Sequence, residues 1–265
     1  MLFLFGQFYD INKDARVLSE YYSGLIKPMG DFLSSYIDSS TGLPHPSYDL
    51  WEQQFLTTTF TTAAVYGALK AAVGLAEANN KNEDAVHWQA AADDIRAAAK
   101  EHLWNADTGY FYKGVRKNHG DLDKDPTIDM SAFYGAFMFG LYDLSSDELK
   151  SAANVIDQKL TQPGTLGYVR FENDGYYNPN PGTIGNPWFV TTLWRAQYYL
   201  ELNMIPEATR LIDWVRAAML PSGVLPEQVR ATSGAYLSVA PLAWSQAEFV
   251  STLIDLVTET TNKDV

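Results

Sequence analysis

Two glutamates stand in aromatic, loop-like segments that are far apart in the sequence. Glu52 follows Tyr48, Asp49 and Trp51 in "PSYDLWEQ", and Glu227 lies in "LPEQ", 175 residues further on (227 − 52 = 175). Glycine and proline precede the first run, which favours a loop. Two carboxyl groups from separate loops can cleave a glycosidic bond, because one protonates the leaving oxygen while the other activates water or attacks the sugar. The simpler interpretation is a pair of solvated loop acids.

Other residues of the same loops suit contacts with a sugar. The acid of such a pair must stay protonated near its working pH, and packing of Glu52 against Trp51 would favour that by desolvation. A later segment, "GYVRFENDGYYNPNPGTIGNPWF", adds Arg170, Asn186 and Trp188. Aromatic rings stack on the apolar faces of pyranoses, and Arg and Asn donate hydrogen bonds to hydroxyls.

The elements that must position these loops are almost all helices. Apolar residues recur at three- and four-residue spacing in nine segments. Connections of two or three residues alternate with long ones at 39–56, 105–128, 161–186 and 220–240, which gathers the long loops at one end, as in an α/α toroid. We therefore expect one all-α domain over residues 1–265. The predicted helices span 1–11, 14–38, 57–79, 83–104, 129–142, 146–160, 187–203, 206–219 and 241–260.

Composition excludes several classes of partner. The formal net charge of −13 repels phosphate, so neither nucleic acid nor an anionic membrane is an expected partner. The chain has no cysteine, which excludes disulfides and thiolate metal sites. No apolar run is long enough to span a membrane. The N-terminal "MLFLFGQFYD" lacks a basic region and a cleavage site, so we interpret it as a core helix and expect a cytoplasmic protein.

No motif predicts a metal or a cofactor. "DLDKDPTIDMSA" spaces its aspartates like the start of a calcium loop, but Pro126 replaces the required glycine and Ala132 the bidentate glutamate. We interpret this segment as a polar loop. The four histidines lack ligand spacing, and phosphate- and dinucleotide-binding glycine motifs are absent from the sequence.

Several segments, taken together, resemble the glucoamylase family, the inverting glucan exo-hydrolases that include glucodextranases and some microbial trehalases. The resemblance starts at "PSYDLWEQ" and "FTTAAVYGALKAAVGLAE", and continues through "RFENDGYY" and "GNPWFVTTLWRAQYYLE". It ends in "LPEQ" and "LSVAPLAWSQAEFV". These segments occur in family order over nearly the whole chain. The resemblance implies an (α/α)6 barrel acting on an α-glucan or an α-linked disaccharide, without a cofactor.

The resemblance also implies roles for single residues. Glu52 falls where the family has its general acid, and Glu227 where it has its general base. Tyr48, Trp51, Arg170 and Trp188 fall on positions that line the sugar subsites, and Gln53 stands where a second, sugar-contacting glutamate is common. The predicted substrate-binding residues are Tyr48, Asp49, Trp51, Gln53, Arg170, Asn186 and Trp188.

The sequence departs from the family pattern in three ways. The family barrel has twelve helices, whereas nine are predicted here. The Trp-x-Arg-Asp segment that holds the sugar ring being cleaved is absent from these 265 residues, and a six-residue insertion, Pro179 to Ile184, interrupts the "YYN…GNPW" join. We expect a fragment, one half of a split enzyme, or a protein that kept the fold and lost a subsite. The alternative function is a non-catalytic sugar-binding or assembly module.

A barrel without about three helices leaves two flanks uncovered. These are the "MLFLFGQFY" helix and the C-terminal helix, where we expect Phe249, Leu253, Leu256 and Val257 to be exposed. Large apolar patches rarely persist on a soluble monomer. We therefore expect a homo-oligomer or a separately made N-terminal half to cover them, and weak hydrolysis by the chain alone.

Overall fold

The computed structural model describes residues 1–161, 164–178 and 184–261. Within these ranges it contains nine helical stretches, each close to a predicted one, so the prediction of a mostly helical fold is confirmed. The insertion lies outside the described residues except for Ile184. The helices are α1 (Leu2–Asn12), a continuous stretch of α2 (Ala15–Tyr21), the π-helical turn η1 (Tyr22–Ile26) and α3 (Lys27–Ser35), then α4 (Thr59–Ala78), α5 (Asn82–His102), α6 (Met130–Met138), α7 (Asp147–Lys159), α8 (Phe189–Glu201), α9 (Ile205–Ala217) and α10 (Ala243–Thr261).

The contacts divide the chain into two compact units, which are described separately. Unit 1 comprises Met1–Pro126 and Gly135–Asp143, and unit 2 comprises Thr127–Tyr134 and Leu144–Val265. The single domain that the sequence predicts over 1–265 stays a prediction.

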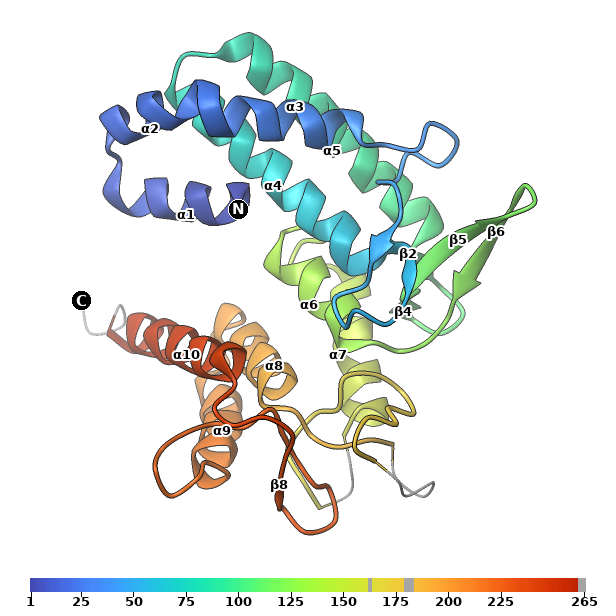
Figure 1. The fold of residues 1–265 in the computed structure, drawn as a ribbon, viewed down its shortest axis with the longest axis vertical. Coiled ribbons are helices and arrows are strands. Elements are labelled where there is room, and N and C mark those ends of the chain that lie inside the picture. The colour runs from blue at the N-terminus through green and yellow to red at the C-terminus, as the bar shows by residue number, and fades with distance from the viewer. Residues whose placement is uncertain (162–163, 179–183, 262–265) are drawn as a thin grey trace. The chain divides into compact units, whose positions relative to one another are not determined.

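Small residues let the helices of unit 1 approach closely. In Figure 1, α1 runs beside α4, and a Cβ built on Gly6 of α1 would lie 2.9 Å from the Cβ of Ala71. A Cβ on Gly30 of α3 would lie 2.5 Å from the ring of Trp88, which is fully buried in α5. A side chain at either glycine would force these helices apart.

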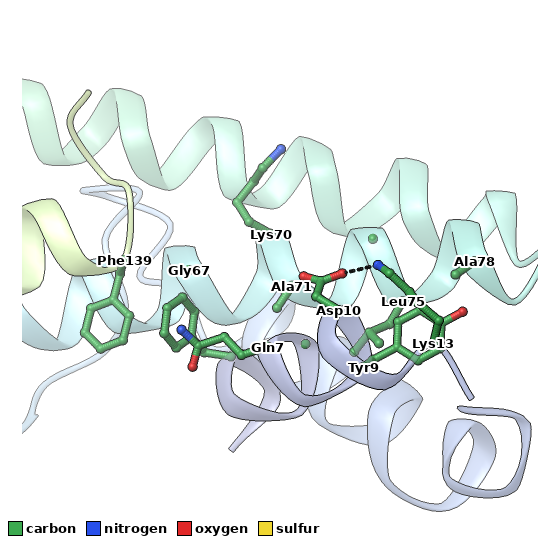
Figure 2. A pocket seen from close by; sticks show the side chains of 13 residues that line it. Gln7, Tyr9, Asp10, Lys13, Gly67, Lys70, Ala71, Leu75, Ala78 and Phe139 are labelled. Carbon is green, nitrogen blue, oxygen red and sulfur yellow. Dashed lines mark hydrogen bonds and ion pairs between the residues drawn. The ribbon is translucent and has the colours of Figure 1, made fainter. Parts of the chain in front are cut away.

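A groove of about 320 Å³ runs between α1 and α4 (Figure 2). Its α4 wall includes the small residues Gly67, Ala71 and Ala78. Its rim carries the exposed ion pair of Lys13 Nζ with Asp10 Oδ1 at 2.7 Å. None of the predicted site residues lines this groove.

A small antiparallel sheet in unit 1 corrects the prediction of a polar loop at residues 121–132. Residues Asp121–Asp125 form a strand that pairs with Gly114–Asn118. His119 (φ 49°) and Gly120 (φ 100°) form the two-residue turn between them. Positive φ at both central residues matches the twist of paired strands, so this turn favours a hairpin. The charged side chains of the two strands hide the usual strand pattern in the sequence. The strand order of this sheet is β1 (Ser47–Tyr48), β2 (Phe55–Thr58), β5 (Gly114–Asn118) and β6 (Asp121–Asp125). A separate two-stranded sheet pairs β3 (Trp104–Asn105) with β4 (Tyr110–Phe111).

Unit 2 is built around α8. This helix is buried over most of its length and contacts both α9 and α10. Its Phe189 and Leu193 pack with Val215 of α9 and with Leu225 and Val229, which follow α9 in the chain. The last two strands, β7 (Gln228–Val229) and β8 (Tyr236–Leu237), form a short hairpin over the same core.

Helix α1 in unit 1 and helix α10 in unit 2 each expose a row of apolar residues. On α1 the exposed residues Leu4, Phe8 and Ile11 are 52–87% accessible, as expected for this flank. On α10 the exposed stripe is Val250, Ile254 and Val257, at 56–61%. Of the α10 residues that we predicted to be exposed, Val257 is correct, whereas Phe249, Leu253 and Leu256 are half-buried.

The shift of the α10 stripe has a direct structural cause. Phe249 packs against the core cluster of unit 2, so the face that contains it points inward and the neighbouring face is exposed. Despite these apolar faces, the described part of the chain contains no helix with the length and hydropathy needed to cross a membrane.

Candidate active site

Glu52 lies in the loop of the β1–β2 hairpin. The Asp49 N–H donates to the carbonyl of Gln54 at 2.8 Å, and the Glu52 N–H donates to the carbonyl of Asp49 at 3.0 Å. The Asp49 carboxylate oxygen Oδ1 accepts from the N–H groups of Gln53 at 2.7 Å and Gln54 at 3.0 Å. A short acidic side chain that accepts from nearby backbone donors stabilises a turn. Asp49 therefore positions Glu52, and its predicted contact with a sugar stays a prediction.

Lys113 stabilises the same turn from an adjoining segment. Its Nζ lies 3.1 Å from Asp49 Oδ2, and both side chains are only 3% exposed. The Lys113 carbonyl accepts from Thr59 N–H at 3.0 Å, which fixes the segment to the start of α4. Sequence reasoning missed Lys113, because its only local signal is a lysine placed between "YFY" and "GV".

Glu52 has an unusual backbone conformation. Its φ of 57° lies in the left-handed region, which side chains with a Cβ rarely adopt. Glu52 is exposed, whereas Trp51 is 8% exposed. The burial of Glu52 that we expected from packing against Trp51 is therefore wrong, because the tight turn places consecutive side chains in different surroundings.

Replacing Glu52 with glycine is expected to stabilise the protein. A non-glycine residue held at this φ costs about 1–3 kcal/mol, and glycine adopts it freely. Glycine also loses more entropy on folding, which offsets part of this gain. We therefore expect Glu52→Gly to raise the free energy of unfolding, measured in urea, by about 1 kcal/mol. Gln53→Gly is the matched control, because Gln53 is exposed in the same turn without a positive φ, and it should lower stability. A loss of stability in Glu52→Gly would contradict the strain.

Three further predicted site residues surround this turn. Tyr48 is 66% exposed, and its ring makes an edge contact with that of Phe55 at 5.5 Å between centroids. Gln53 is exposed beside Glu52. Trp51 forms part of the core, so of these three residues Tyr48 and Gln53 offer accessible surface to a ligand.

Arg170 is the centre of a second cluster, in unit 2. Its Nε and Nη2 donate to the two oxygens of Asp174, each at 2.8 Å, which forms a buried bidentate pair. The guanidinium also lies over the rings of Trp188 and Tyr176, 4.4 and 5.0 Å from their centroids. Arg170 is 4% and Trp188 3% exposed. Planar Arg pairs and stacks in this manner better than lysine could. The sugar contacts of Arg170 and Trp188 stay predictions.

A ladder of single β-bridges connects the segment of Glu227 to the same cluster. Tyr168 pairs with Trp188, and Trp188 pairs with Gln228, so three distant loop segments run side by side. The Glu227 carbonyl accepts from the Phe189 N–H at 3.4 Å, and its N–H donates to the Val239 carbonyl at 3.0 Å. Glu227 itself is half-buried. Its backbone is thus fixed on both sides, while its carboxylate receives a long contact, 3.5 Å, from the Gln228 side chain.

Asn186 ties two of these loops together. Its side-chain amide donates to the carbonyl of Tyr177 at 3.1 Å, and its oxygen accepts from the Ala231 N–H at 3.2 Å. Asn186 is buried, so its predicted sugar contact also stays a prediction. The structure therefore gathers the predicted residues into two clusters, one per unit, and the predicted separation of Glu52 and Glu227 remains a prediction.

These helices and carboxylate-bearing loops define a protein of the glucoamylase fold. A bacterial glucoamylase solved in complex with acarbose superposes with a TM-score of 0.75 at 20% sequence identity, over 91% of this chain and 38% of that one. The chain therefore has the fold of part of a glucoamylase, whose complete fold is an (α/α)6 barrel, and its described residues contain nine helical stretches of it.

The sequence identifies the family. The model of the glycosyl hydrolases family 15 matches residues 1–219, so the chain belongs to this family, as its resemblance implied. An uncharacterized glycosyl hydrolase of Methanocaldococcus jannaschii is 28% identical over 219 residues, which are 77% of this chain and 33% of that protein. A trehalase of Mycobacterium tuberculosis is 22% identical over 80% of this chain and 30% of its own length.

The sequence matches cover part of this chain and part of each relative. The chain spans about a third of the two curated relatives. The family model ends at residue 219, before Glu227. The role of Glu227 therefore depends on the "LPEQ" resemblance and on its place in the unit 2 ladder.

Proposed function

We propose that this chain carries the catalytic face of an inverting hydrolase that releases glucose from α-glucosidic bonds. Glu52 is the general acid and Glu227 the general base. The observation that carries the proposal is the state of Glu52, an exposed carboxylate at φ 57° on a turn fixed by the buried Asp49–Lys113 pair. Strained residues that their surroundings hold in place cluster at active sites.

Inversion requires a particular spacing of the two carboxyls. A water molecule must fit between the base and the sugar, which sets roughly 6.5–9.5 Å between the carboxyl groups. We expect Glu52 and Glu227 to take this separation in the working enzyme. Membership of the glycosyl hydrolases family 15 supports the reaction class, and the trehalase among the relatives extends the substrate class to α-linked disaccharides.

The anomer of the first product tests the mechanism. Inversion of an α-glucosidic bond gives β-glucose, whose H1 signal in a proton NMR time course precedes mutarotation. With trehalose as the substrate, we expect β- and α-glucose to appear first in equal amounts, because the attacked ring becomes β while the leaving glucose keeps its α configuration. Early α-glucose without an equal amount of β-glucose would contradict inversion. Glucose release no faster than that of a Glu52→Gln/Glu227→Gln double variant would instead favour the alternative, a sugar-binding or assembly module.

The exposed apolar faces of α1 and α10 support the proposal that the active protein contains a further polypeptide component. At roughly 25 cal/mol per Å², covering several hundred Å² of apolar surface is worth several kcal/mol before the costs of association. We propose that a second copy or a separately supplied N-terminal half of the barrel covers them. The 265 residues lack the Trp-x-Arg-Asp segment, so we expect the chain alone to hydrolyse maltose slowly.

Sedimentation and glucose release test this component together. We expect the purified chain either to sediment as an oligomer or to bind the N-terminal helices of a family 15 barrel, with a rise in glucose release in the second case. Leu4→Glu and Ile254→Glu place a charge on each exposed face and should weaken the association. A chain that is monomeric, binds no such helices and hydrolyses maltose at a full rate would contradict the proposal.

A further inference from the structure

A polar cavity of about 300 Å³ lies in unit 2 and is lined by none of the candidate site residues. Helices α7, α8 and α9 and the segment that follows α7 contribute to it. Its polar lining residues include Asp157, Thr165, Tyr168, Tyr199, Glu207 and Arg210.

A hydrogen-bonded network fixes one wall of this cavity. The Asp157 carboxylate accepts from Nε and Nη2 of Arg195, at 3.0 and 2.7 Å, and from the Tyr168 hydroxyl at 2.6 Å. Arg195 Nη2 also donates to the Tyr199 hydroxyl at 2.9 Å. Arg195 is 4% exposed, and its Nη1 is buried without a hydrogen-bond partner among the described residues. The network thus fixes the Asp157 carboxylate and the hydroxyls of Tyr168 and Tyr199 along this wall.

The charges around the cavity balance. Asp157 and Arg195 neutralise each other, and the exposed Glu207 and Arg210 add one charge of each sign. Burial, and then the Asp157 carboxylate, raise the pKa of Tyr168, so its hydroxyl stays protonated and donates to Asp157. The chain as a whole carries −13, which disfavours an anionic ligand. Because the charges around the cavity sum to zero, they do not favour the binding of a cation either.

We propose that this cavity binds one neutral, polyhydroxylated ring, at a site whose residues are separate from those around Glu52 and Glu227. A volume of about 300 Å³ is at the low end for small-molecule sites, so the cavity suits a single ring. Hydroxyl groups of the ligand accept from Arg210 and donate to Glu207, and the rings of Tyr168 and Tyr199 supply apolar surface. The ligand is either a free monosaccharide or the terminal unit of an oligosaccharide.

Amide chemical shifts of the complete chain test the proposal. D-glucose, maltotriose and gluconate serve as a neutral ring, a neutral chain end and an anion. We expect saturable shifts at Thr165, Leu166 and Leu211 with glucose, with maltotriose, or with both. Comparing the two sugars shows whether the ligand is a free monosaccharide or the end of an oligosaccharide. Gluconate should bind more weakly. Arg210→Ala should weaken binding about tenfold, the usual effect of losing a hydrogen bond to a charged group.

Two variants separate this site from its surroundings and from the proposed reaction. Arg216→Ala is the matched control, because Arg216 lies on the same helix and pairs with Asp213 outside the cavity. It should bind like the unmodified chain. Glu227→Gln should keep the shifts at Thr165 and Leu166, so failure of the proposed reaction would leave this site intact. Absent or non-saturable shifts with both sugars, equal binding by Arg210→Ala, or gluconate binding as tight as glucose would each overturn the proposal.

Discussion

Glutamine at position 52 is expected to lower glucose release from maltose by about 100-fold to 10,000-fold, the usual contribution of a general acid. The amide keeps the size and the turn conformation of Glu52 but has no proton to deliver to the leaving oxygen. Glu227→Gln should have an effect of similar size, because the amide cannot activate water. Rates relative to the unmodified chain, prepared with the same partners, provide the measurement.

The leaving group separates the two roles. Fluoride leaves from α-glucosyl fluoride without needing protonation, so Glu52→Gln should recover most of its activity on this substrate, whereas Glu227→Gln should not. Glu83→Gln is the control, because Glu83 is an exposed acid in the first turn of α5. Equal losses on both substrates for Glu52→Gln would show that Glu52 is not the acid.

Loss of the Lys113 charge is expected to lower the free energy of unfolding by about 3–5 kcal/mol, because it leaves the buried Asp49 carboxylate without its ion pair. Lys113→Met keeps the apolar length of the side chain and removes only the ammonium. Unfolding in urea, followed by circular dichroism, measures the change. The same variant should also slow hydrolysis, since the turn that positions Glu52 is loosened.

A lysine of the same sheet provides the control. Lys117 pairs with Asp38 at the surface, with half of its side chain exposed, so Lys117→Met should cost less than about 1 kcal/mol. Adding Asp49→Asn to Lys113→Met removes the unpaired charge and keeps the oxygen that accepts from the turn, so it should restore part of the stability. Equal costs for Lys113→Met and Lys117→Met would contradict the role of the buried pair.

The helices were predictable because their signal is local and repeated. Each has apolar residues on one face, and caps such as Thr58, whose hydroxyl accepts from the Thr61 N–H, mark where a helix begins. The β5–β6 hairpin was missed because its strands are charged and two-sided, and only His119 and Gly120 indicate the turn.

The loop positions of the candidate catalytic residues were predictable from the sequence, whereas the residues that hold those loops in place were less so. Gly/Pro punctuation and the resemblance placed Glu52 and Glu227 in loops, and the structure agrees with that. The partner of Asp49 was missed because Lys113 is 64 residues away in the sequence (113 − 49 = 64), and only the pairing of strands brings the two together. The sequence also did not show that Trp51 is buried and Glu52 exposed, because the tight turn places consecutive side chains in different surroundings.

The two units are interleaved along the chain, and this affects how the protein is made. The last piece of unit 1, Gly135–Asp143, is synthesised after the first piece of unit 2. It carries Phe139, whose ring contacts those of Phe3 and Phe60 at 5.0 and 5.7 Å between centroids, and which packs against Gly67. On the ribosome, α1 and α4 therefore stay incomplete until residue 139 has emerged. A fragment cut at Pro126 would leave the rings of Phe3 and Phe60 without Phe139, because each unit consists of two separate stretches of sequence.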